Sequence, residues 1–164
     1  MIFNYKHNPE LYNILLNLSR NIFFYKKIEL LDSFETRIYL MFFHFSILMI
    51  IYKQKNQKFD QKEYDGIFNN IENNLRELGF GDVSVNKKMK DLNKLLYDIL
   101  LKINKKQDKS FELNEKLVSK YFETLNDKND DKMVNFERYF NRFYQFCFEL
   151  PLENMIRETL KFKL

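Results

Sequence analysis

The chain has 164 residues, enough for one domain with a substantial hydrophobic core. Apolar residues make up 45% of the chain and charged residues 30%, a balance that excludes an intrinsically disordered protein. The formal net charge of +4 favours acidic partners or anionic surfaces, but it is too small to predict binding to DNA. We therefore predict a folded chain that forms a single domain over 1–164.

The composition favours helices. Glycine and proline are rare, with Gly 3 and Pro 2, so few residues force a turn and long helices with short links are expected. Alanine is absent while Phe, Ile, Asn and Lys are frequent, which follows the codon usage of an AT-rich genome. The many aromatic residues therefore need no functional explanation. The single cysteine, Cys147, excludes an intramolecular disulfide.

Apolar residues recur at helical spacing from the first segment onward. The first predicted helix begins just after Pro9 and carries Leu11, Leu15 and Leu18. The second, at about 34–52, follows a capping Ser33 and is apolar nearly all round, so we expect it at the centre of the fold.

The apolar run 38–51 inside this second helix is shorter than the ~20 residues of a membrane-spanning helix. It also contains His44 and Ser46. We interpret it as a buried core helix, with a membrane-embedded segment as the minority alternative.

Two further helices flank a glycine-containing turn. Asp60 with Glu63 resembles a capping box that begins one helix, and Gly79 stands where a left-handed residue would end it. After the turn 79–82, apolar residues at alternating spacings of four and three predict the next helix, to about Ile103. The two apolar seams comprise Tyr64, Ile67, Phe68, Ile71, Leu75 and Leu78, and then Val85, Met89, Leu92, Leu96, Ile99 and Ile103.

The last third of the chain continues the pattern. Ser110 is predicted to cap a shorter helix that carries Leu113, Leu117, Tyr121 and Leu125. After the polar loop 126–131, a third stripe comprises Met133, Phe136, Phe140, Phe143, Cys147 and Leu150. Pro151 interrupts before a terminal helical segment. With no strand alternation to compete, the sequence predicts an all-α bundle of about six to seven helices around the central one.

No catalytic or metal-binding pattern is complete. His7 and His44 have no neighbouring nucleophile or carboxylate at a useful spacing, and Cys147 lies on an apolar stripe, as expected of a buried thiol. The segment from Asp127 resembles the start of a calcium loop, but lysine and arginine stand where glycine and glutamate are needed. We therefore predict neither an enzyme nor a protein with a metal or other cofactor.

Two features have alternative interpretations. Lys87, Lys88, Lys90 and Lys94 open a helix, where cations oppose the helix dipole, so they form either a solvated face or a contact surface for an acidic partner, ribosomal RNA or lipid headgroups. In the helix 133–150, Tyr139, Tyr144, Phe146 and Phe148 lie off the main stripe. They either complete the core or form an exposed apolar groove for a client protein.

Two blocks of the sequence resemble the ubiquinol–cytochrome c chaperone family. One is Arg76-Glu77-Leu78-Gly79-Phe80-Gly81-Asp82 followed by Val85, Lys87, Lys88 and Met89, which is similar to the family's arginine-containing run, "GxGD" turn and basic helix. The other is Asp32-Ser33-Phe34 with Arg37 and then the apolar helix that holds His44. The resemblance is strongest over 24–103. This chain departs from the family pattern at Glu35-Thr36, where Asp-Gly is common, and at Asn86, where proline is common.

The resemblance implies an assembly factor for respiratory complex III that binds newly made cytochrome b, at the ribosome or with a small partner subunit. The absence of a transit peptide then implies a bacterial member in the cytoplasm, at the inner face of the plasma membrane and in peripheral contact with it. A helical adaptor or regulator with an acidic or hydrophobic partner, unrelated to respiration, is the main alternative.

Within this hypothesis, Arg76, Lys87, Lys88 and Lys90 are the predicted partner-binding residues. Gly79, Gly81 and Asp82 are expected to shape the turn that presents them. Arg37 and His44 are assigned structural roles, as a charged helix start and a buried, hydrogen-bonded imidazole.

Overall fold

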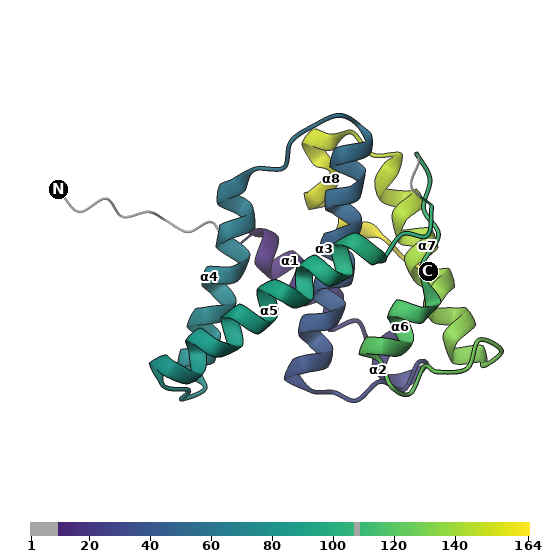
Figure 1. Cartoon of the computed structure of the whole chain (residues 1–164). Coiled ribbons are helices and arrows are strands. Elements are labelled where there is room, and N and C mark those ends of the chain that lie inside the picture. The colour runs from purple at the N-terminus through teal and green to yellow at the C-terminus, as the bar shows by residue number, and fades with distance from the viewer. Residues whose placement is uncertain (1–9, 107–108) are drawn as a thin grey trace.

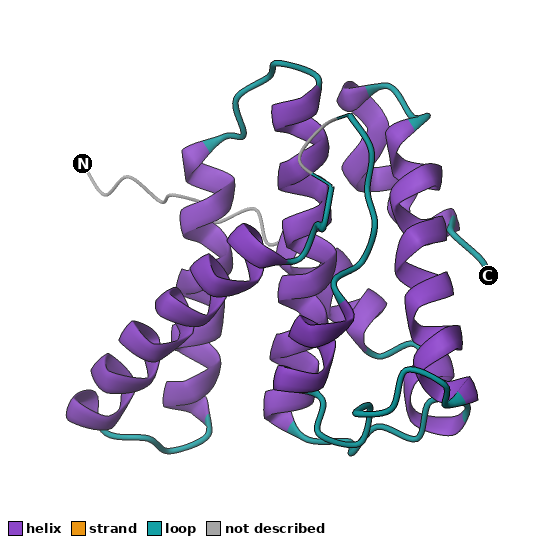
Figure 2. Cartoon of the chain, turned by 45° about the vertical axis from the view of Figure 1, so that its right-hand side comes forward, coloured by secondary structure: helices purple, strands orange, loops and turns teal. Residues whose placement is uncertain are grey.

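The computed structural model describes residues 10–106 and 109–164, and in these ranges its regular secondary structure is helical throughout (Figure 1 and Figure 2). A single antiparallel bridge joins Asn104 to Leu113. Pro9 and His7 lie outside the described residues. The prediction of an all-α fold is confirmed. In chain order the helices are α1 Glu10–Ser19, α2 Ile22–Lys26, α3 Phe34–Gln54, α4 Gln61–Glu77, α5 Asp82–Lys102, α6 Glu115–Tyr121, α7 Asp131–Phe148, α8 Leu152–Glu158 and the 3₁₀ turn η1 Thr159–Lys161.

Helix α3 forms the centre of the fold, as predicted. The Ser33 hydroxyl caps it by accepting a hydrogen bond from the Thr36 amide at 3.2 Å. The helix contacts α1, α5 and α7, and buried side chains occur on all its sides. Among the described helices, α3 is the one with the length and apolar composition of a membrane-spanning helix. In its most apolar stretch of 18 residues, 67% is buried inside the fold. Packing in the core thus accounts for most of this apolar surface.

Aromatic side chains fill the space between α2, α3 and α7. Phe24, from the short α2, is fully buried, and its ring centre lies 4.7 Å from that of Tyr139. Phe43 on α3 packs against Phe140 on α7 with ring centres 5.6 Å apart. Helix α2 was not predicted, because a five-residue helix is too short to show a helical period.

The additional aromatic residues of α7 belong to the core and its edge. Tyr139 and Tyr144 are buried. The ring of Phe146 lies 5.6 Å from that of Phe162, and the ring of Phe148 stacks 5.5 Å from that of Tyr144. Of the two interpretations of this helix, completion of the core is therefore the one that the structure supports.

The predicted helix start at Ser110 is wrong. Helix α6 begins at Glu115, and its cap is Asn114, whose side chain accepts a hydrogen bond from the Lys116 amide at 3.1 Å. Ser110 lies in the preceding loop, where its carbonyl oxygen accepts hydrogen bonds from the side chains of Gln54 and Asn104. Contacts from other parts of the fold thus outweigh the local capping preference of serine.

Helices α4 and α5 form a hairpin that packs beside α1 and α3 (Figure 1). Asp60 caps α4, as predicted, by accepting a hydrogen bond from the Lys62 amide at 2.9 Å. The seam of α5 is fully buried at Val85 and Leu96. Leu78, however, which the spacing placed on the buried seam of α4, is 59% exposed at the tip of the hairpin.

Candidate partner-binding groove

The turn between α4 and α5 is built on Gly79. This residue has φ +94°, a conformation that side chains with a Cβ rarely adopt. The Gly79 amide donates to the Arg76 carbonyl at 3.0 Å, and the Phe80 amide donates to the Leu75 carbonyl at 3.3 Å. These two bonds form a Schellman motif, which ends α4 and places Phe80 back over its last turn.

Arg76 fastens the two ends of the hairpin together. Its guanidinium donates to the carboxylate of Asp82, the first residue of α5, and to Glu72 at 3.2 Å. Hydrogen bonds to Asp82 and then Glu72 raise the pKa of Arg76. Gly81 caps α5 with φ −74° and ψ 166°, extended values that any residue can adopt. Arg76 therefore acts inside the turn, with its charge balanced by two carboxylates.

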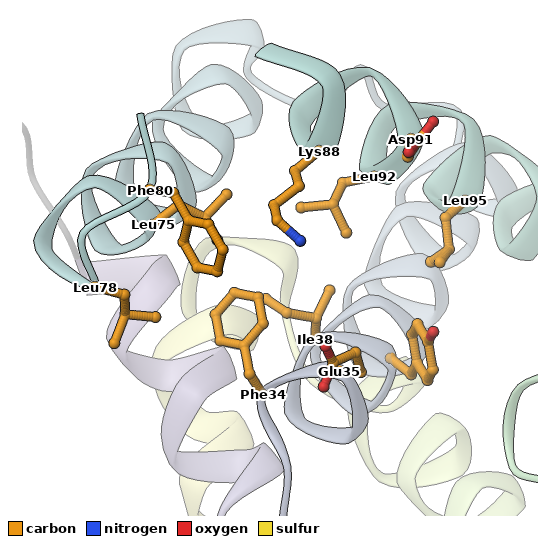
Figure 3. Close-up of a pocket in the computed structure, with 11 residues that line it drawn as sticks. Phe34, Glu35, Ile38, Leu75, Leu78, Phe80, Lys88, Asp91, Leu92 and Leu95 are labelled. Atoms are coloured by element: carbon orange, nitrogen blue, oxygen red, sulfur yellow. The ribbon is translucent and has the colours of Figure 1, made fainter. Parts of the chain in front are cut away.

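An apolar groove lies between this turn, α5 and the first turns of α3 (Figure 3). Its volume is about 510 Å³, within the roughly 300–1,000 Å³ typical of ligand sites. The rings of Phe34 and Phe80 stand on facing sides of it. The lining residues are Phe34, Glu35, Ile38 and Tyr39 from α3, Leu75, Leu78 and Phe80 from α4 and the turn, and Lys88, Asp91, Leu92 and Leu95 from α5.

Lys88 is the basic residue of this groove. Its ammonium group lies 4.7 Å from the centre of the Phe80 ring, and Figure 3 shows it pointing into the cavity. Lys87 and Lys90 are both exposed. Successive residues of a helix are rotated by about 100° around its axis. Lys87, Lys90 and Lys94 therefore lie on one face of α5, and Lys88 lies on a different face. The four predicted partner-binding residues thus occupy three places: the turn, the groove and the outer face of α5.

His44 lies deep in the core, away from the groove. Its Nδ1 is 2.7 Å from the Leu40 carbonyl oxygen, which can only accept, so Nδ1 carries the proton. Its Nε2 then accepts from the Tyr139 hydroxyl at 2.8 Å, and this bond joins α3 to α7. Burial away from water lowers the pKa of His44 from 6.5 to about 4, so the imidazole is neutral at pH 7.

Arg37 stands at the start of α3, where its guanidinium pairs with Asp32 at 3.3 Å. This ion pair ties the segment before the helix to its first turn. Since the Arg37 side chain is 34% exposed, the pair is a surface contact of modest strength.

The described residues include no group of three or more His, Cys, Asp or Glu side chains that could hold a metal ion. The Cys147 thiol is buried, and loss of hydration raises its pKa, so it is a poor nucleophile at neutral pH. The groove presents apolar side chains, the Lys88 ammonium and the carboxylates of Glu35 and Asp91.

The groove brings together the two sequence blocks that carry the family resemblance. Phe34 comes from the first block, and Leu78, Phe80 and Lys88 come from the second. Sequence reasoning did not predict this juxtaposition, because the second half of α3 and most of α4 separate the two blocks along the chain. Two apolar residues in a turn, Leu78 and Phe80, were the available signal of an exposed apolar surface.

An all-helical fold with an open apolar groove is typical of proteins that bind a helical partner. The model of the ubiquinol-cytochrome C chaperone family matches residues 26–162, most of the chain, and the protein belongs to this family. The match continues beyond Ile103, past the part of the sequence over which the resemblance is strongest. No match was found among curated proteins or among solved structures.

Proposed function

We propose that this protein is an assembly chaperone for respiratory complex III that binds newly made cytochrome b and assists its maturation without catalysis. The family match over 26–162 is the observation that carries the proposal, since it supports a role in the assembly of this complex. The particular client is our inference.

The groove supports a binding role. A chaperone for a membrane protein must cover apolar segments before they are buried, and this requires apolar surface of its own. Leu78 and Phe80, at 59% and 39% exposure, provide such surface at the tip of the α4–α5 hairpin. The outer face of α5, with Lys87 and Lys90, is a second contact surface, for ribosomal RNA, a small partner subunit or anionic lipid.

Deletion of the gene tests the proposed function. We expect reduced cytochrome b, measured by its haem absorbance in membranes, and reduced quinol–cytochrome c reductase activity, both restored by the wild-type gene. An unrelated adaptor would leave both quantities unchanged, and that result would contradict the proposal. Cell fractionation tests the proposed location at the cytoplasmic face of the membrane.

A further inference from the structure

We propose that the groove between α3 and the α4–α5 hairpin binds one amphipathic helix of the client, whose apolar face fills the groove and whose acidic side chain pairs with Lys88. This inference rests on the proposed function and specifies how the client is held.

The shape of the groove favours a helix. Its walls are helices α3 and α5, so a third helix can pack against both with its apolar side chains between theirs. The described residues offer the groove no strand edge to which an extended peptide could add. A helical partner also keeps its own backbone hydrogen bonds while it lies on an apolar surface.

The exposure of the groove favours a protein segment over a small ligand. Sites for small molecules bury about 70–90% of the ligand surface. Here Leu78 and Phe80 form a lip that remains 59% and 39% exposed. An occupant that extends past this lip is needed to cover it, and a helix of several turns has that length.

The charge at the groove indicates an acidic side chain on that helix. The Lys88 ammonium points into the cavity over the Phe80 ring and forms no ion pair with a carboxylate of the described residues. Arg76, in contrast, already has two carboxylate partners. Two carboxylates, Glu35 and Asp91, also line the groove; neither forms an ion pair with Lys88, and that of Asp91 points away from the cavity in Figure 3. Lys88 is thus the cation available to a client in this apolar setting, where a charge pair is screened less than on an open surface.

The test uses the full chain and labelled synthetic peptides that cover the helices of cytochrome b from the same organism. We expect one peptide to bind, and Lys88→Glu to weaken its binding about tenfold or more. The matched control is Lys62→Glu, the same charge change at an exposed residue of α4 outside the groove, which should alter the affinity less than twofold. Changing the acidic residue of the peptide to lysine should restore binding to the Lys88→Glu chain.

A second pair of variants tests the apolar contacts. Leu78→Ser removes an apolar side chain from the lip, whereas Leu101→Ser removes one that is 79% exposed on α5 outside the groove. Only the first should weaken peptide binding. Melting curves for all variants confirm that each is folded.

Three results would overturn the inference. The first is an equal loss of binding with Lys62→Glu and Lys88→Glu, and the second is no restoration by the charge-reversed peptide. The third is binding of oleate at Lys88 with no peptide bound. Capture of cytochrome b from cells separates this inference from the proposed function. If wild-type and Lys88→Glu chains capture it equally, the groove inference fails and the function stands. If neither chain captures it, the proposed function fails.

Discussion

The buried pair of His44 and Tyr139 makes the stability of this fold depend on pH. His44 is fully buried, and the Tyr139 hydroxyl occupies its Nε2 at 2.8 Å. Its pKa is about 4 in the folded chain and about 6.5 when the chain unfolds. Between these values the unfolded chain binds a proton that the folded chain does not, so stability falls as the pH decreases from 6.5 toward 4.

The expected loss is about 3 kcal/mol, because each tenfold difference in proton affinity is worth about 1.4 kcal/mol. In a chain of this size that corresponds to a decrease of about 6–12 °C in the melting temperature. Above pH 6.5 the neutral, buried His44 contributes its full stabilisation to the folded chain. Urea unfolding followed by circular dichroism between pH 7.5 and 4.5 measures how the free energy of unfolding changes with pH.

His44→Gln is the informative variant, because glutamine keeps a donor and an acceptor in the core but does not titrate. We expect it to be less stable at pH 7 and to lose most of the pH dependence. The ion pair of Glu115 with Lys105 does not contribute to the pH dependence in this range. Hydrogen bonding to Lys105 lowers the pKa of Glu115 to about 2, so the stability from this pair is lost only below pH 4.5. Parallel stability profiles for the wild type and His44→Gln would refute the reasoning.

The remaining predictions concern the turn, the α6 cap and the thiol. Gly79→Ser should destabilise the chain by about 1–2 kcal/mol because of its φ of +94°, whereas Gly81→Ser should be neutral or slightly stabilising, since serine is a good helix cap. Chemical denaturation distinguishes them, and equal effects would contradict the assigned turn. Asn114→Ala should lower the free energy of unfolding by about 1 kcal/mol in the same assay, whereas Ser110→Ala should lower it little. The reverse order would show that Ser110 caps the helix, as the sequence predicted. Cys147 should react with Ellman's reagent only after unfolding, because burial raises the pKa of its thiol; rapid reaction of the native chain would show that it is accessible.

The helices of this protein follow from local signals in its sequence. The all-round apolar character of about 34–52 predicts a central helix, because such a helix cannot face water on any side. Ser33, Asp60 and Gly79 mark helix ends, because caps and left-handed residues act within a few residues of the backbone groups that they satisfy. These features depend only on neighbours in the chain.

What depends on distant neighbours was decided by the tertiary structure. Asn114 replaced Ser110 as a cap because the Ser110 carbonyl is bonded to Gln54 and Asn104. Lys88 and Lys87, adjacent in sequence, lie on different faces, one in the groove and one in solvent.

The groove itself exists only because α5 packs against α3 and brings Phe34 opposite Phe80. Helical periodicity shows which side of each helix is apolar. It does not show which helices meet, because that choice depends on the packing of all side chains at once.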